Sequence, residues 1–218
     1  FSFSPSRLLA LPLSDLFGSQ ATRNYWAYWK DWSSAYLGVW PPLLALIALI
    51  QAFKAWRLKK NIEVKDPFPL IACLVLGSIA VLLAMGRHHP LYRLVMQLPG
   101  FEYFRAPSKF LPYFILPVAL LAGRGWDLLR QGKGPGWRIW VVLPLLMLVA
   151  GGLALLLEGN RFSAAHYPVA IRTGALALAI YGAGLILLLS FPRLKGSKWR
   201  GWITILFLAL ALGDLYGY

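Results

Sequence analysis

The residues best suited to chemistry lie in one stretch, 87–110, which joins two strongly apolar segments. If a helix starts near Pro107, Arg105 and Lys109 stand at its N-terminus beside the hydroxyl of Ser108. Two cations, a hydroxyl and the positive end of a helix dipole would favour a phosphate or pyrophosphate there. The same cations could instead simply anchor the helix to lipid headgroups.

A short amphipathic pattern precedes this site. Its apolar residues recur at helical spacing, at Leu91, Leu94, Val95 and Leu98. Pro90 suits a first helical position and 99–100 is a Pro-Gly stop, so two turns are expected to lie flat on the membrane surface. The N-terminus of this helix, with Arg87, His88 and His89, could receive a lipid phosphate. Metal or pigment ligation by the two histidines is the weaker alternative, because adjacent side chains diverge and no Cys, Asp or Glu stands at ligand spacing.

Aromatic side chains could contact a sugar or an acceptor. The N-terminal stretch 1–35 is rich in them, at Tyr25, Trp26, Trp29 and Trp32, and Tyr92 lies on the short helix. Such density before a membrane segment is also typical of an interfacial belt, since Trp and Tyr combine an apolar ring with a polar tip. Glu102 could pair with Arg105 or serve as a base.

Motifs of soluble enzymes are missing from the sequence. It contains no Gly-x-Ser-x-Gly, phosphate-binding loop, dinucleotide fingerprint or His-Glu-x-x-His. The single cysteine, Cys73, excludes a disulfide within the chain. The chain begins with Phe1 and shows no signal-peptide pattern, so we expect it to be processed or incomplete.

Composition and hydropathy predict the elements that position these residues. The 218 residues are 59% hydrophobic and only 14% charged, too little charge to cover a soluble domain. Six apolar windows follow, at 36–53, 67–85, 108–129, 139–157, 173–190 and 199–213, of which the third and sixth have uncharged cores at 110–122 and 201–213. We therefore predict an all-α, polytopic membrane bundle of about six transmembrane helices, with the interfacial helix and outer loop at 87–109.

The distribution of positive charge predicts the orientation. The net charge of +14 could indicate nucleic acid, but the cations cluster between apolar windows, so no nucleic-acid partner is expected. When the third and sixth windows are taken as their uncharged cores, five, four and four of the 22 Lys and Arg residues lie in the connections after the first, third and fifth windows. The positive-inside rule places these connections in the cytoplasm, with both ends of the chain and stretch 87–109 outside.

Several short motifs together resemble one family. They are Pro90-Leu91-Tyr92, Leu98-Pro99-Gly100-Phe101, Phe104-Arg105-Ala106-Pro107-Ser108-Lys109-Phe110 and Leu121-Ala122-Gly123-Arg124-Gly125-Trp126-Asp127, with Tyr36-Leu37-Gly38, the stretch 13–18 and Gly213-Asp214-Leu215. In this order, over most of the chain, they resemble the bacterial YfhO-type membrane proteins of the GT-C class of polytopic glycosyltransferases, in their middle-to-C-terminal membrane portion.

The resemblance implies transfer of a sugar from a polyprenyl-phosphate carrier to an acceptor on the outer side of the cytoplasmic membrane. It maps an Arg-x-Pro-x-basic element onto Arg105, Pro107 and Lys109, where Lys109 replaces a more usual arginine and loses bidentate geometry. The family's catalytic carboxylate belongs to an earlier external loop, and neither Asp15 nor Asp31 matches it. The catalytic residue is thus unknown, no cofactor is expected in this stretch, and a divalent metal is conceivable only in the complete protein.

Two other classes compete with the enzyme. A non-catalytic membrane scaffold, packed against other subunits of a larger complex, would fit a chain without its catalytic carboxylate. A transporter is the weaker rival, because coupling ions and protons usually need a charged residue inside the membrane and the uncharged windows contain none.

Overall fold

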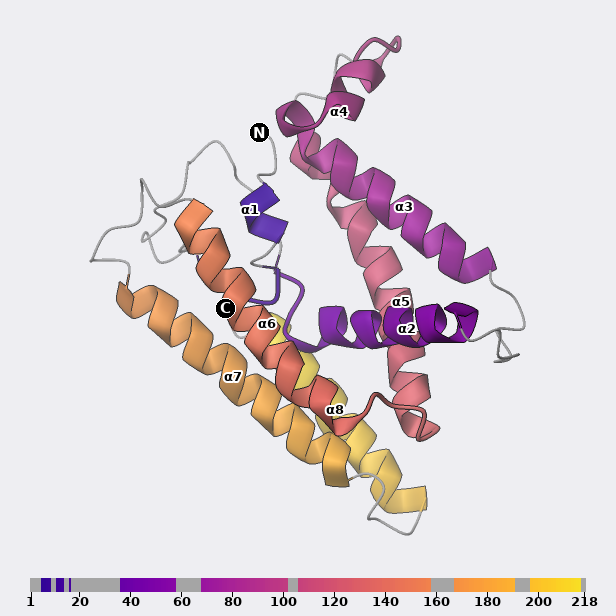
Figure 1. Cartoon of the computed structure of the whole chain (residues 1–218), viewed down its shortest axis with the longest axis vertical. Helices are drawn as coiled ribbons and strands as arrows, with labels where there is room; N and C mark the ends of the chain where they lie inside the picture. The colour runs from indigo at the N-terminus through magenta and orange to yellow at the C-terminus, as the bar shows by residue number, and fades with distance from the viewer. Residues whose placement is uncertain are drawn as a thin grey trace.

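The computed structural model describes residues 5–8, 11–13, 16, 36–57, 68–101, 106–157, 167–190 and 197–216 (Figure 1). Every regular element within these ranges is a helix, which confirms the predicted all-helical class. The α-helices are α1 (Pro5–Leu8), α2 (Trp40–Arg57), α3 (Phe68–Ala84), α4 (Pro90–Val95), α5 (Pro112–Arg130), α6 (Trp137–Leu157), α7 (Tyr167–Ser190) and α8 (Ser197–Tyr216). Two 3₁₀ turns, η1 (Gly86–His88) and η3 (Pro107–Phe110), flank α4 and α5.

Each predicted apolar window overlaps one long helix, although α2 begins only at Trp40 and α7 begins six residues before its window, at Tyr167. Proline changes a further boundary. The window 108–129 is divided into η3 and α5, with Pro107 opening the first and Pro112 the second. Proline has a fixed φ and no N–H, so it suits the first position of a helix and interrupts a preceding hydrogen-bond ladder. The short amphipathic helix is present as α4, which ends at Val95, and residues 96–100 continue it as turns.

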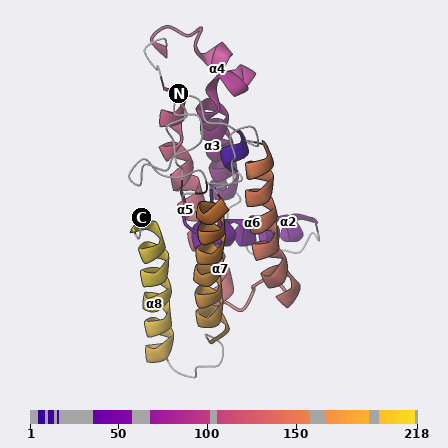
Figure 2. The same ribbon diagram turned by 90° about the vertical axis from the view of Figure 1, so that its left-hand side faces the viewer.

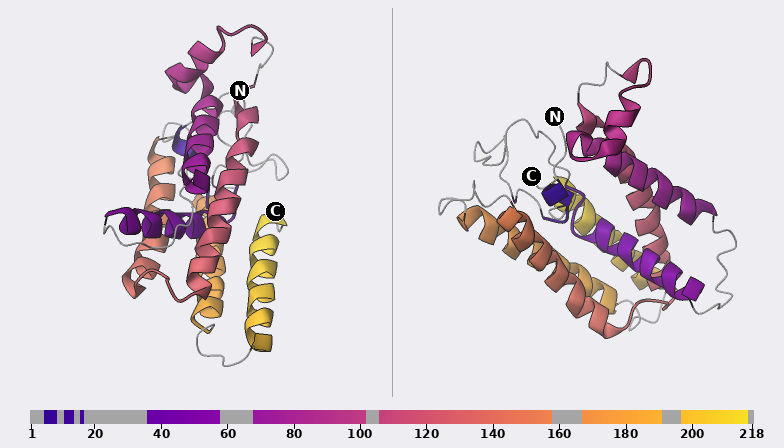
Figure 3. Two further views of the ribbon diagram at one scale, coloured as in Figure 1. Left: turned by 90° about the vertical axis from the view of Figure 1, so that its right-hand side faces the viewer. Right: turned by 45° about the horizontal axis from the view of Figure 1, so that its top comes forward.

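The long helices run up and down, so their ends gather at two poles of the bundle (Figures 1, 2 and 3). One pole holds the end of α3, α4, η3 and the start of α5, with the end of α6 and the start of α7. The other pole holds the ends of α5 and α7 and the starts of α6 and α8. The turn between α5 and α6 therefore lies on the same side as the end of α7 and the start of α8.

Helix α2 departs from this pattern, because it lies crosswise to α5 in Figures 1 and 2. It packs against α5 where Gly125 faces the backbone of Leu44. Its side chains enter two hydrophobic clusters, one with α6, α7 and α8 and one with α3 and α5, and Trp40 and Ile47 are fully buried. The first half of α2 is therefore largely covered by protein, whereas its last turns carry Gln51, Lys54 and Arg57 and expose Phe53.

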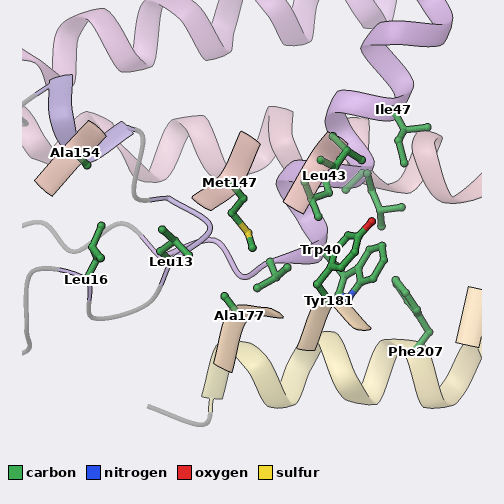
Figure 4. Packing of buried hydrophobic residues seen from close by; sticks show 14 residues of the cluster. Leu13, Leu16, Trp40, Leu43, Ile47, Met147, Ala154, Ala177, Tyr181 and Phe207 are labelled. Carbon is green, nitrogen blue, oxygen red and sulfur yellow. The ribbon is translucent and has the colours of Figure 1, made fainter. Parts of the chain in front are cut away.

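Aromatic rings around Trp40 join four helices at the centre of the larger cluster (Figure 4). The indole stacks on Tyr181 of α7, with ring centroids 5.3 Å apart and planes inclined by 7°, and meets the edge of Phe207 of α8 at 5.1 Å. Its Nε1–H donates to the carbonyl oxygen of Ile180 at 3.1 Å. The Tyr181 hydroxyl donates to the carbonyl oxygen of Trp140 on α6. The polar atoms of this core therefore find partners inside it.

Two helices are long and apolar enough to cross a membrane, α6 over Arg138–Leu157 and α7 over Tyr167–Ser190. Only 22% of each of these windows is buried within the chain, so neither resembles the covered core helix of a soluble protein. Three further helices have shorter apolar segments, at Trp40–Lys54, Leu70–Ala84 and Gly201–Leu215. These two helices confirm the prediction of a helical chain with candidate membrane spans.

Candidate functional site

The described candidates of the predicted phosphate site share one pole of the bundle. His88 belongs to η1, His89 and Tyr92 to α4, and Ser108 and Lys109 to η3. Helix α3 holds these segments together, since it packs against both η3 and α4 (Figure 1). Residues separated by about 20 positions in the sequence are therefore brought to one surface.

The histidines differ in their surroundings. His89 is the N-cap of α4, and its Nδ1 accepts a 3.2 Å hydrogen bond from the backbone N–H of Leu91. We expected an anion to accept hydrogen bonds from the backbone N–H groups at this helix end. One of these groups, the N–H of Leu91, already donates to His89. His88 is exposed, and Arg87 lies beside it in η1.

Ser108 and Lys109 occupy the 3₁₀ turn before α5. The ammonium-bearing side chain of Lys109 is exposed, Ser108 is half-buried, and Pro107 beneath them is buried. The backbone N–H of Lys109 donates to the carbonyl oxygen of Ala106 at 3.1 Å. What this turn offers an anion is thus chiefly the lysine charge and the serine hydroxyl.

Tyr92 lies half-buried on α4, at the same pole as these groups. Burial raises the pKa of its phenol above the usual 10.0, because the phenolate loses solvation. The side chain is therefore neutral at physiological pH and can offer a ring face, as sugar contact would require.

The other predicted contacts fall outside the described residues. These are Tyr25, Trp26, Trp29 and Trp32 of the aromatic stretch, with Glu102 and Arg105 before η3. Their roles stay predictions. Within the described part of stretch 1–35, Leu11, Leu13 and Leu16 are buried, and Leu13 and Leu16 lie against Gly151 of α6 (Figure 4).

No group of three or more His, Cys, Asp or Glu side chains that could hold a metal ion occurs in the described ranges. Cys73 is buried and free.

Sequence reasoning missed a buried carboxylate, that of Asp214 near the end of α8. Its side chain is 4% exposed, and Oδ2 accepts a 2.7 Å hydrogen bond from the backbone N–H of Val39. Oδ1 accepts from the hydroxyl of Tyr36. Gly38, with φ +77°, brings the backbone close, since a Cβ there would lie 3.1 Å from Oδ2. Two of the family-like motifs, Tyr36-Leu37-Gly38 and Gly213-Asp214-Leu215, therefore form one contact.

This contact assigns Asp214 a positioning role. An acidic side chain at the start of a helix satisfies backbone donors and complements the helix dipole. Asp214 does this for the start of α2, from a helix that is distant in sequence. Because both carboxylate oxygens are occupied by the protein, the group is poorly placed to act as a base toward a substrate.

The opposite pole carries exposed cations. They are Lys54 and Arg57 on α2, Arg124 and Arg130 on α5, Lys133 in the following turn and Arg138 on α6. The side-chain Nε2 of Gln51 donates to the carbonyl oxygen of Lys133 at 2.8 Å, which ties α2 to that turn. This contact brings the second half of α2 close to the turn between α5 and α6.

Comparison with protein-family models, with curated proteins and with solved structures finds no match for this chain.

Proposed function

We propose that the chain is the membrane portion of a GT-C-like glycosyltransferase. In this proposal it helps to transfer a sugar from a polyprenyl-phosphate carrier to an acceptor on the outer side of the bacterial cytoplasmic membrane. Lys109 and Ser108, with Arg105, would bind the carrier phosphate, and the pole that holds α4 would face outward. The observation that carries the proposal is the exposed apolar surface of α6 and α7, beside a pole with an exposed cation and a hydroxyl.

The exposed side chains of α6 support placement in lipid. Nine large aliphatic residues of this helix are exposed: Val141, Val142, Leu145, Leu146, Leu148, Val149, Leu153, Leu156 and Leu157. Full burial of one such side chain stabilises a protein by roughly 1.5–3 kcal/mol. Partial exposure of nine of them to water therefore costs roughly 10 kcal/mol of stability. This is comparable with the whole stability of a typical soluble domain, about 5–15 kcal/mol. Lipid would remove this cost.

The remaining long helices would complete the bundle. Helices α3 and α8 expose Leu74, Val75, Leu76 and Ile79, and Ile205, Leu206, Leu208 and Leu212. A helix of about 20 residues spans about 30 Å, the thickness of a hydrocarbon core. The proposal of about six membrane segments then includes α2 as a segment enclosed by protein rather than by lipid.

The sugar-transfer part depends on motif order and on charge. Lys109 is exposed at the pole that the positive-inside rule assigns to the outer face, where a carrier phosphate would lie. Tyr92 and His88 share that pole and could contact a sugar or a pyrophosphate. A scaffold lacks any reason to bind a polyprenyl phosphate, so binding of this lipid separates the two functions.

Cysteine labelling in intact cells tests the membrane placement. In a Cys73→Ala background, Gln97→Cys and Gln131→Cys each create one exposed thiol, at opposite poles. We expect an impermeant maleimide to label Gln97→Cys directly and Gln131→Cys only after permeabilisation. Equal labelling of both variants, or extraction of the protein by carbonate, would contradict the placement.

Transfer and binding assays test the enzyme. In the full-length protein, Arg105→Ala and Lys109→Ala should each lower polyprenyl-phosphate sugar binding or glycosyl transfer by about 10-fold or more, the loss expected for one charge-assisted contact. Arg172→Ala removes an exposed cation of α7 at the same pole and should change neither quantity. Unchanged kinetics in both site variants would refute the assignment, and stable co-purification with other subunits without transferase activity would favour the scaffold.

A further inference from the structure

We propose that the pole opposite Lys109 binds the headgroups of anionic phospholipids through a cationic rim, defined as Lys54, Arg57, Arg124, Arg130, Lys133 and Arg138. The inference goes beyond sugar transfer and depends only on the membrane placement in the proposed function. The occupant would be a two-chain phospholipid with a net negative headgroup, such as phosphatidylglycerol.

The charge of the rim is strongly one-sided. All six side chains are exposed. Among the described side chains, Asp and Glu occur only as Asp127, which is exposed on α5, and Asp214, which is buried away from the rim. One carboxylate near six cations leaves a large positive excess, which attracts anionic lipid by about 1 kcal/mol per basic residue near the surface.

Contacts between helices hold parts of the rim together. The hydrogen bond from Gln51 to the carbonyl oxygen of Lys133 fixes α2 beside the turn after α5. Lys54 follows Gln51 by three residues, one helical turn along the same face. Lys54 and Lys133 therefore stand near each other although 79 positions separate them in the sequence.

Apolar surface continues directly from the cations. On α6, Arg138 is followed at i+3, i+4 and i+7 by the exposed side chains of Val141, Val142 and Leu145. These positions form one face of a helix, so a cation begins a stripe of aliphatic side chains.

Helix α5 has the same arrangement, but there the apolar side chains come before the cation in the sequence. Leu116 and Leu120 are 61% and 57% exposed, and Arg124 follows them at i+8 and i+4 on the same face. Both helices thus present a cation at the pole and apolar side chains toward the middle of the bundle.

This combination favours a lipid over a soluble polyanion. A free phosphate or a polyphosphate needs only the cations, whereas a phospholipid also places acyl chains along the apolar stripes. Lys and Arg side chains next to such stripes can lie along the apolar surface and direct their charge to the headgroup.

Spin-label electron paramagnetic resonance tests the rim. The full chain is reconstituted into phosphatidylcholine vesicles that contain spin-labelled phosphatidylglycerol or spin-labelled phosphatidylcholine, and the motionally restricted fraction of each is compared. We expect the native chain to prefer phosphatidylglycerol. Arg124→Gln/Arg138→Gln should reduce this preference by about fivefold or more.

A matched pair controls for net charge. Arg93→Gln/Arg172→Gln removes two exposed cations from the other pole and should keep the preference. Equal losses in the two double variants, or no preference in the native chain, would overturn the proposal. Competition by inorganic phosphate beyond that of chloride at equal ionic strength would also overturn it, in favour of a soluble-anion site. Flotation of the protein with the vesicles, measured on the same samples, separates failure of the rim from failure of the membrane placement.

Discussion

The carboxylate of Asp214 accepts a hydrogen bond from the backbone N–H of Val39 across 175 positions of sequence. The same carboxylate accepts a hydrogen bond from the hydroxyl of Tyr36, so one buried side chain fixes the segment that leads into α2. Because α2 lies between the two hydrophobic clusters, this contact holds the start of the helix that connects them.

Asp214→Ala should therefore destabilise the protein. Loss of the acceptor leaves the buried backbone N–H of Val39 unsatisfied, at a cost of about 1–3 kcal/mol, and removes one hydrogen bond of the Tyr36 hydroxyl. Asp214→Asn retains a carbonyl oxygen for Val39 and should cost less. Thermal unfolding in detergent measures both effects, with Asp127→Ala, an exposed carboxylate, as the control that stays within about 0.5 kcal/mol of the native protein. Equal effects of Asp214→Ala and Asp127→Ala would contradict the role.

The crossing of α2 and α5 predicts a pair of glycine effects. A Cβ on Gly125 would overlap with the carbonyl oxygen of Leu44, whereas a Cβ on Gly123 would meet nothing within 4 Å. Gly125→Ala should force the two backbones apart and lower the free energy of unfolding by about 1–3 kcal/mol. Gly123→Ala should be neutral or slightly stabilising, since alanine favours helix by about 0.5–1 kcal/mol. A comparable loss in both variants would show that the close approach is not the cause.

The aromatic core predicts a similar contrast on α7. A Cβ on Gly184 would overlap with Nε1 of Trp40, and a Cβ on Gly182 would meet nothing within 4 Å. We expect Gly184→Ala to lower the melting temperature in detergent and Gly182→Ala to leave it nearly unchanged. Trp40→Phe in the Gly184→Ala background should recover part of the loss, because the smaller ring makes room. A double-mutant cycle measures this coupling, and strict additivity would argue against the contact.

Tyr92 predicts a dependence on alkaline pH. Burial raises its folded-state pKa above the unfolded value of 10.0, so the folded protein keeps a proton that the unfolded chain has released. The contribution of this group to stability is then complete below pH 10 and is lost as the pH rises through the folded pKa. Ultraviolet titration of phenolate absorbance should show that Tyr92→Phe removes a transition with a midpoint above 10.0. If the transition that Tyr92→Phe removes has its midpoint at or below pH 10.0, the assignment is contradicted.

The helices were predictable from the sequence, whereas the placement of α2 was not. Lipid and a protein interior both exclude charge, so an uncharged apolar window is compatible with either environment. Leu43 and Ile47 are apolar because α2 is enclosed, whereas Leu145 and Leu156 on α6 are apolar and exposed. Hydropathy cannot distinguish these cases, and the predicted number of six spans therefore stays a proposal.

The candidate site was only partly predictable for a related reason. The run around Pro107 indicated a helix start, and η3 and α5 begin there. His89 acts as a cap because its side-chain Nδ1 accepts a hydrogen bond from the backbone N–H of Leu91. The local sequence allows this bond but does not require it. The partners of Asp214 lie 175 and 178 positions away, and no local pattern reports such a pair. A carboxylate directly after an apolar window was the only available signal.

The crosswise setting of α2 also has a consequence for biosynthesis. A ribosome makes Trp40 and Val39 early, but Tyr181, Phe207 and Asp214 emerge up to 175 residues later. At about 5–20 residues per second, this delay lasts about 10–35 s. Until Tyr181 has been made, the segment has neither its stacking partner nor its carboxylate, and α2 completes its packing only after the last helix has been synthesised.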